Sequence, residues 1–246
     1  MLPKIHRRMP FSGSEKLFAR LQDALYAQGL LSGQSEQELL NVFRSSASPE
    51  EWYEFAGRVF PAHQQRDEIL RFLSMIKASA PRAVLEIGTA QGGTNFLIGQ
   101  ILDSVEIIIA LDLRVRNKRL LDMFSRNSLK RICMNGSSHE LLTCEQVQHT
   151  LSGTPLDLLF IDGDHSYEGV SEDYLMYRHL VRKGGLIAFH DIVDDHQTKY
   201  GRPSNGWAGG VPKFWNELKS SNESTFCWEF ISDPDQDGMG IGVLQT

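Results

Sequence analysis

Cysteine is scarce in this sequence. Only three of the 246 residues are cysteines, and Cys133, Cys144 and Cys227 form no C-x-x-C pair. An odd, scattered set of this kind provides neither a disulfide framework nor a cysteine zinc site. We therefore expect reduced thiols in a cytoplasmic protein, and a chain of this length can bury a stable core without covalent cross-links.

Long apolar runs and clustered basic residues are also missing. No segment approaches the ~18–20 apolar residues that a membrane-spanning helix needs, and the basic N-terminus lacks the apolar segment of a signal peptide. The net charge is -6, and the basic patches at residues 4–8 and 114–119 are short. Because a nucleic-acid surface requires clustered Lys and Arg, we expect neither a nucleic acid nor a membrane as a partner.

Residues 1–62 have the pattern of a helical extension to a larger domain at residues 63–246. Apolar residues recur at helical spacing around Phe18, and Ser48–Glu51 has the order of a capping box with proline at the first helical position. An amphipathic extension cannot bury its own apolar face. Its expected roles are a cover for a cofactor, a homo-oligomer interface or a route for substrate.

The larger domain alternates between buried strands and helices. Its continuous apolar runs predict parallel strands covered on both faces, and the last two segments have no helix between them, which predicts an antiparallel hairpin. The expected fold class is α/β, a Rossmann-like doubly wound seven-stranded sheet with the last strand antiparallel. The predicted strands are 83–88, 106–113, 130–136, 156–164, 184–193, 225–232 and 238–245, and the main predicted helices after the first strand are 94–102 and 170–181.

A glycine-rich loop follows the first of these strands, with the sequence EIGTAQGGT from Glu86 to Thr94. It lacks the GK[ST] ending of a phosphate-binding loop and the G-x-G-x-x-G spacing of a dinucleotide fold. The glycines allow close approach to the backbone. Gly93 and Thr94, at the start of the next helix, offer N–H groups to a carboxylate.

Acidic residues stand at or just past four strand ends: Glu86, Asp112, Asp162 and Asp191. Ligands of open α/β sheets bind beyond this edge. Asp112 is suited to the two ribose hydroxyls of a nucleoside, and an acid at Glu86 suits a cation better than a pyrophosphate. S-adenosylmethionine meets both conditions, because it joins adenosine to an amino-acid tail through a sulfonium and has no phosphate.

The segments VLEIGTAQGG, IALDL, FIDGDHSYEGV and GGLIAFHDIV, followed by the hairpin, resemble class I S-adenosylmethionine-dependent methyltransferases. The resemblance covers residues 64–246. It is most specific over residues 160–192, which are similar to bacterial small-molecule O-methyltransferases, including macrolide-sugar methyltransferases and the cephalosporin hydroxylase-like group. It implies a seven-stranded sheet and methyl transfer to a small hydroxylated metabolite or sugar.

The loop chemistry and the resemblance together predict a set of cofactor-binding residues. The family places adenine after the third strand, at residues 135–139. The predicted set is Glu86, Gly88, Thr89, Gln91, Gly92, Gly93, Asp112, Leu113, Gly136, Ser137 and Asp162.

The resemblance also implies a metal site at Asp162, His190 and Asp191. The sequence departs from the family pattern by having His190 at the first position of the later pair. Mg²⁺ prefers oxygen ligands, whereas imidazole suits Mn²⁺, Fe²⁺ or Zn²⁺. Either the metal differs from Mg²⁺, or His190 faces the cofactor and no metal binds.

His165 is the predicted general base, because the family has its base at this position and an imidazole accepts a proton near neutral pH. Asp164 is the alternative base. The long glycine-rich segment at residues 200–215, which carries Trp207, is predicted to be a mobile substrate lid.

Three other functions stay open at this point. The same sheet class supports an NAD-linked oxidoreductase, although the glycine spacing and the hairpin argue against it. A non-catalytic module with a retained cofactor pocket would show the same motifs. Methylation of nitrogen or carbon is disfavoured by the missing NPPY-type signature of amino-group methyltransferases.

Overall fold

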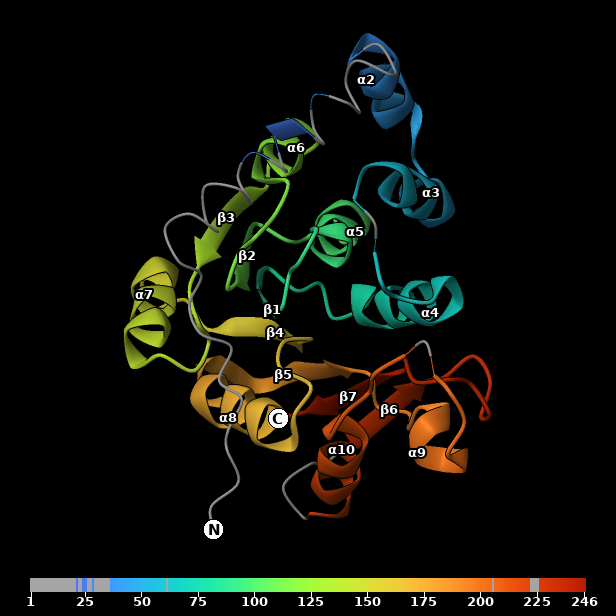
Figure 1. Cartoon of the computed structure of the whole chain (residues 1–246). Coiled ribbons are helices and arrows are strands. Elements are labelled where there is room, and N and C mark those ends of the chain that lie inside the picture. The colour runs from blue at the N-terminus through green and yellow to red at the C-terminus, as the bar shows by residue number, and fades with distance from the viewer. Residues whose placement is uncertain are drawn as a thin grey trace.

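The computed structural model describes residues 21, 24, 25, 28, 36–60, 62–204, 206–221 and 226–246. Its centre is one seven-stranded sheet with the order β3-β2-β1-β4-β5-β7-β6 (Figure 1). The strands are β1 Ala83–Ile87, β2 Ile107–Asp112, β3 Lys130–Asn135, β4 Leu156–Ile161, β5 Val181–His190, β6 Phe226–Phe230 and β7 Ile241–Gln245.

Strand β7 runs antiparallel to both of its neighbours, and every other neighbouring pair in the sheet is parallel. The predicted fold class is therefore confirmed. The apolar runs of β1 and β4 are buried along nearly their whole length, because helices cover both faces of the sheet there.

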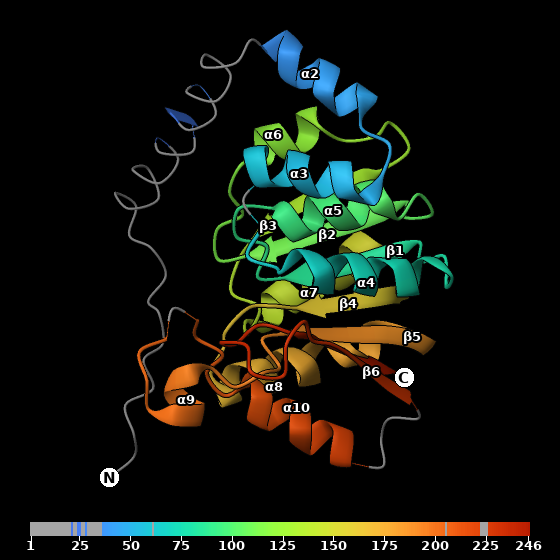
Figure 2. The same cartoon turned by 90° about the vertical axis from the view of Figure 1, so that its right-hand side faces the viewer.

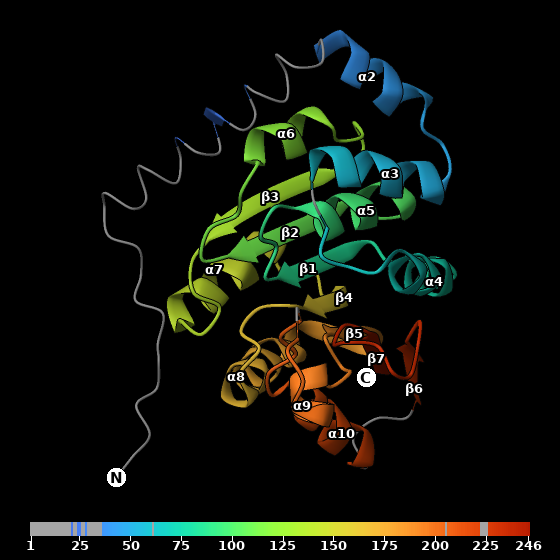
Figure 3. The ribbon, with the colours of Figure 1, turned by 45° about the vertical axis from the view of Figure 1, so that its right-hand side comes forward.

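The described helices are α2 Glu36–Ser45, α3 Pro49–Val59, α4 Arg66–Lys77, α5 Gly93–Ile101, α6 Lys118–Met123, α7 Leu141–Leu151, α8 Tyr167–Tyr177, α9 His196–Tyr200 and α10 Val211–Ser220. Two apolar clusters separate them into layers. One cluster joins α3, α4, α5 and α6 to one face of the sheet. The other joins α7, α8 and α10 to the opposite face (Figure 3).

The end of one predicted helix and the bounds of the strand after it need correction: β5 covers Val181–His190 and not residues 184–193. The helix predicted for residues 170–181 ends at Tyr177, continues as a short 3-10 turn, and gives way to β5 at Val181. Val181 pairs with Leu156 of β4, so strand pairing decides its conformation. The helix expected around Phe18 and the strand residue Thr225 lie outside the described residues.

The described part of the extension packs on the helix layer that covers one face of the sheet. Ser48 caps α3 in a capping box with Glu51, as predicted. Phe55 and Phe60 are fully buried and stack on Phe96 of α5, with ring centroids 5.4 and 5.0 Å apart. Figure 2 shows α3 lying alongside α5. This contact brings the segment between α3 and α4 to the N-terminal end of α5.

None of the helices in the described part of the chain is long and apolar enough to span a membrane.

Candidate functional site

The loop between β1 and α5 owes its shape to two glycines with positive φ. Gly88 has φ +88°, and a Cβ at this position would overlap the backbone carbonyl of Asp162, which follows β4. Gly92 has φ +96° and is the N-cap of α5. Only glycine adopts such angles at low cost, so the loop passes close to β4 and then turns into the helix.

Glu86 lies beneath this loop and is 1% exposed. Its Oε2 accepts a hydrogen bond of 2.7 Å from the hydroxyl of Thr89. Burial raises the pKa of Glu86 to about 7, against the lowering effect of Thr89 and Asn95. The observed contacts of Glu86 and Thr89 therefore order the loop from below.

The start of α5 carries N–H groups without a side-chain cap. Gly92 makes no side-chain capping hydrogen bond, and the first N–H groups of a helix have no partner inside it. Beside them, the backbone of Gly93 lies against Phe60 and Ala62. Gln91, in the loop, has a buried amide oxygen without a hydrogen-bond partner in the described part of the chain. The N–H groups at the start of α5 are suited to an anionic group, whereas the Gln91 oxygen is an acceptor and requires a donor.

Asp112 ends β2 and is held by local backbone. Its two carboxylate oxygens accept hydrogen bonds from the N–H groups of Ala90 and Arg114, at 2.8 and 2.7 Å. Burial raises the pKa of Asp112, partly offset by these two hydrogen bonds. Leu113, the next residue, is 41% exposed at the same edge.

The predicted adenine loop follows β3 at the same edge. The N–H of Gly136 donates to the carbonyl of Asp112 at 2.9 Å, which places Gly136 next to the predicted ribose acid. Ser137 begins the turn into α7. Tyr177 of α8 donates to the carbonyl of Ser138 at 3.0 Å, so the loop is held from the helix layer below.

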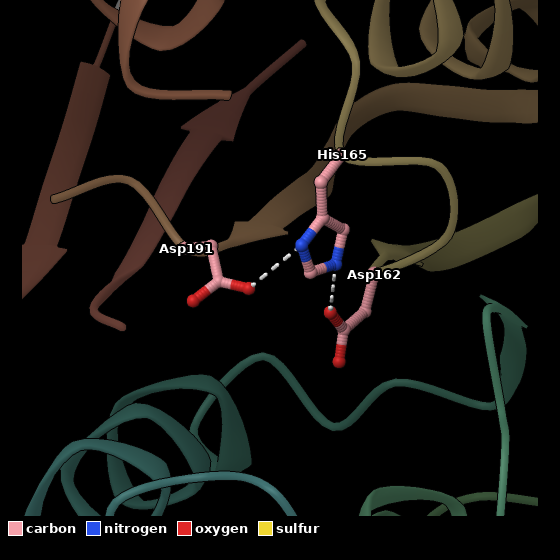
Figure 4. A group of neighbouring side chains, drawn as sticks. All are labelled: Asp162, His165 and Asp191. Atoms are coloured by element: carbon pink, nitrogen blue, oxygen red, sulfur yellow. Dashed lines mark ion pairs between the residues drawn. The ribbon is translucent and has the colours of Figure 1, made fainter. Parts of the chain in front are cut away.

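Asp162, His165 and Asp191 converge where β4 and β5 end (Figure 4). His165 Nε2 lies 3.4 Å from Asp162 Oδ1, and His165 Nδ1 lies 3.4 Å from Asp191 Oδ2. Each residue offers one atom that could bind a metal ion, and these three atoms all lie within 4.8 Å of one another. Asp191 has φ +61°, and its Oδ1 accepts the N–H of Met239 at 3.0 Å.

His190 is next to this group but occupies a different position. It is 4% exposed, and its Nδ1 lies 3.2 Å from both Asp162 Oδ1 and Asp191 Oδ2. Its Nε2 is buried without a hydrogen-bond partner in the described part of the chain. The three residues whose atoms lie close enough to bind one metal ion are thus Asp162, His165 and Asp191. The resemblance implied His190 as the imidazole ligand and His165 as the base.

The two acids and two imidazoles change one another's pKa values. Burial lowers the pKa of His165, but Asp162 and Asp191 raise it to about 9. For His190, burial again lowers the pKa, and the same carboxylates raise it well above its ordinary value. Burial would raise the pKa of Asp162, but His190 and His165 hold it well below its usual range. The site is therefore a compact arrangement of opposite charges.

His165 is also fixed by the segment that the sequence suggested as a lid. Its Nδ1 is 2.7 Å from the carbonyl oxygen of Trp207, and its ring stacks on the indole at a centroid distance of 5.5 Å. The N–H of Gly210 donates to the carbonyl of His165 at 2.7 Å. Trp207 itself is 66% exposed.

The lid prediction is wrong for residues 211–215. These residues begin α10, where Trp215 is 1% exposed in the core, because the helix must cover the sheet face beside β5. Asp164 accepts the N–H of Ser166 at 2.8 Å and so shapes the turn into α8. The structure thus shows Asp164 in a loop-ordering contact, and its role as a base stays a prediction.

Sequence reasoning missed Gln64, which precedes α4. Its Nε2 donates to Asp162 Oδ2 at 2.9 Å. No motif marks this glutamine, since its partner is 98 positions away in the sequence.

Residues 85–192 match the family model described as a methyltransferase domain. "Uncharacterized protein R132" of Acanthamoeba polyphaga mimivirus is 29% identical over 197 residues, which cover 71% of this chain and 76% of the relative. An O-methyltransferase from Bacillus cereus, solved in complex with SAH, has a TM-score of 0.57 at 18% identity, over 86% of this chain and 96% of that chain.

A second solved structure has the same fold. MycE methyltransferase from the mycinamycin biosynthetic pathway, in complex with Mg, SAH and mycinamycin VI, has a TM-score of 0.53 at 14% identity. The match covers 78% of this chain and 52% of that chain. At these identities the two solved structures establish the shared fold.

Proposed function

We propose that this protein, a methyltransferase by its domain at residues 85–192, uses S-adenosylmethionine to methylate a hydroxyl oxygen of a small molecule. The carrying observation is the group Asp162, His165 and Asp191. It lies at the same sheet edge as the glycine loop and Asp112. One edge of the sheet therefore carries the glycine loop and the acid that suit S-adenosylmethionine, and next to them the group of acids and imidazole.

The proposed cofactor contacts follow the sequence prediction, except that Glu86 and Thr89 act through the loop and not on the cofactor. Asp112 takes the ribose hydroxyls, since a carboxylate is a strong acceptor, and Gly136 and Ser137 flank the adenine beside Leu113. Gly88, Gln91, Gly92 and Gly93 leave the loop backbone open to the amino-acid tail. Glu86 and Thr89 support the loop through their 2.7 Å hydrogen bond, and Asp162 contributes negative charge near the sulfonium.

Methyl transfer is a direct displacement at the sulfonium. The protein's main contributions are to align oxygen, methyl carbon and sulfur, and to exclude water. A protonated hydroxyl is a weak nucleophile, so the site also needs a proton acceptor or a charge that stabilises the oxygen. Both needs point to His165 and the two acids that face it.

Two carboxylate oxygens and an imidazole nitrogen within 4.8 Å of one another fit a divalent metal ion. Such a donor set suits Mn²⁺, Fe²⁺ or Zn²⁺ better than Mg²⁺. An ion held by Asp162, His165 and Asp191 would supply positive charge to the substrate oxygen as the methyl group is transferred. His190 would then stabilise both acids from below through its Nδ1.

His165 has two proposed roles that exclude each other. In the neutral form of His165, Nδ1 donates to the Trp207 carbonyl at 2.7 Å, and Nε2 is then the nitrogen that either binds a metal or accepts the hydroxyl proton. Because Asp162 and Asp191 raise the pKa of His165 to about 9, this neutral form is the minor one at neutral pH. One nitrogen lone pair cannot do both. The metal requirement therefore decides between the role of ligand and the role of general base.

The test is calorimetric titration of the chelator-treated protein with S-adenosylmethionine and S-adenosylhomocysteine, repeated with Mn²⁺ and Mg²⁺. We expect micromolar binding of both nucleosides and a separate heat for Mn²⁺. Binding of neither nucleoside would contradict the proposal. Binding without methyl transfer to any hydroxylated acceptor would favour a non-catalytic module.

A further inference from the structure

Gln64 is a buried amide that reaches the site from outside the matched methyltransferase domain. It lies between α3 and α4 and is 4% exposed. Its Nε2 donates to Asp162 Oδ2 at 2.9 Å, and its backbone carbonyl accepts the hydroxyl of Tyr53 at 3.1 Å. Main chain and side chain are thus both held in place.

The orientation of the amide follows from its neighbour. The reversed orientation would place the amide oxygen 2.9 Å from Asp162 Oδ2, so that two acceptor oxygens would face each other. Gln64 Oε1 is therefore the free end of the amide. It is buried and has no hydrogen-bond partner among the residues that the structure describes. A buried acceptor of this kind requires a donor.

The surroundings of Gln64 indicate which donor it meets. Ala62, two residues earlier, lies against Gly93 at the start of α5. This nine-residue helix has no side-chain cap, so its first N–H groups are suited to a carboxylate. Gln64 also contacts the Asp162 carboxylate at 2.9 Å, and a carboxylate there favours a cation. Acceptors beside a helix N-terminus are the complement of an amino-acid zwitterion.

We propose that Gln64 Oε1 accepts a hydrogen bond from the α-ammonium group of S-adenosylmethionine while the N-terminus of α5 binds its carboxylate. This inference rests on the proposed function and deepens it. The segment between α3 and α4 then contributes directly to cofactor binding. The methyltransferase domain would be incomplete without residues that precede it.

The test compares two nucleosides that differ in the amino-acid end. S-adenosylhomocysteine has the end, and 5′-methylthioadenosine lacks it. We expect Gln64→Met to weaken S-adenosylhomocysteine about 10- to 100-fold, as for a lost hydrogen bond to a charged group, and to change methylthioadenosine less than about 2-fold. Gln65→Met is the matched control, because Gln65 makes no side-chain capping hydrogen bond.

Equal losses for both ligands, or no loss for either, would overturn the inference. If the wild-type protein bound neither nucleoside, the proposed function would fail instead, so the two failures are distinguishable. Gln64→Asn keeps the amide but retracts its oxygen, and we expect the same ligand-selective loss. Thermal melts of all variants identify any that fails to fold.

A last comparison separates direct contact from an effect through Asp162. In an Asp162→Ala background, a direct contact predicts that Gln64→Met still weakens S-adenosylhomocysteine selectively. If Gln64 only orients the carboxylate, the second substitution adds nothing. That result would overturn the proposed contact.

Discussion

The site has two halves, one around Asp112 and one around Asp162. They differ in which groups form hydrogen bonds or ion pairs with the acid. Asp112, at the end of β2, is held by the N–H groups of Ala90 and Arg114. Asp162, at the end of β4, faces the side chains of Gln64, His165 and His190. The first half is organised by its own backbone, and the second by side chains from distant segments.

This difference extends to charge. Burial raises the pKa of Asp112, whereas the imidazoles hold the pKa of Asp162 well below its usual range. A carboxylate held by neutral amides keeps its charge available to neutral hydroxyl donors. One placed among imidazoles shares its charge with other ionisable groups, which suits proton or metal chemistry. The comparison thus separates a binding half from a reacting half.

The largest effect is expected where the two halves touch. Gly88→Ala would place a Cβ in the carbonyl of Asp162 at a φ of +88°, and we expect a loss of about 4 kcal/mol or more in the free energy of unfolding. Gly153→Ala is the matched control, since its φ is +83° but nothing lies within 4 Å. It should cost only about 1–2 kcal/mol of strain. Equal denaturation midpoints would refute the proposed close approach.

Asp191→Ala should impair the reaction without impairing nucleoside binding. We expect turnover to fall about 10²- to 10⁴-fold, as for loss of a group that assists proton transfer. We also expect the heat of Mn²⁺ binding to disappear from the calorimetric titration. The affinity for S-adenosylhomocysteine should stay unchanged. Asp194→Ala, three residues further on, is the control. A retained Mn²⁺ heat in Asp191→Ala would remove Asp191 from the metal site.

Asp112→Ala should impair nucleoside binding without impairing metal binding. Losing hydrogen bonds from two ribose hydroxyls to a carboxylate predicts about a 100-fold or greater loss in affinity. The loss should be the same for S-adenosylhomocysteine and methylthioadenosine, because both carry the ribose. The Mn²⁺ heat should persist. Unchanged calorimetric affinities would show that Asp112 does not bind the nucleoside.

The smallest effect is a pH dependence from Glu86 beneath the loop. Its folded pKa is raised from 4.5 to about 7. The protonated form therefore favours folding, and this contribution is full below pH 4.5 and lost as the pH rises through about 7. The loss is about 3 kcal/mol at most.

Glu86→Gln should remove that dependence, since the amide oxygen can still accept the Thr89 hydroxyl. The variant should become more stable relative to the wild-type protein between pH 5 and pH 8 in denaturant titrations. Parallel pH profiles for the two proteins would contradict the raised pKa. Glu145→Gln, on the exposed surface of α7, is the control for the removal of a carboxylate.

Much of the fold was predictable because its signals are local. Continuous apolar runs mark β1 and β4, and the missing helix before β7 marks the antiparallel hairpin. The lid prediction failed at Val211 because an amphipathic helix and a glycine-rich loop share a boundary there. The sequence predicts a helix through Val181, because the pairing of Val181 with Leu156 is not visible in the sequence.

The sequence by itself determined which strand ends carry polar groups: the glycine loop at Gly88–Gly93 and the acids at or just past the ends of β1, β2, β4 and β5. Those features depend on backbone conformation and burial within a few residues. Only the tertiary structure decided which side chains meet at Asp162. His165 forms a hydrogen bond with the carbonyl of Trp207, 42 positions away, and Gln64 donates a hydrogen bond to Asp162, 98 positions away. Such contacts depend on how whole layers pack, and no short segment encodes that packing.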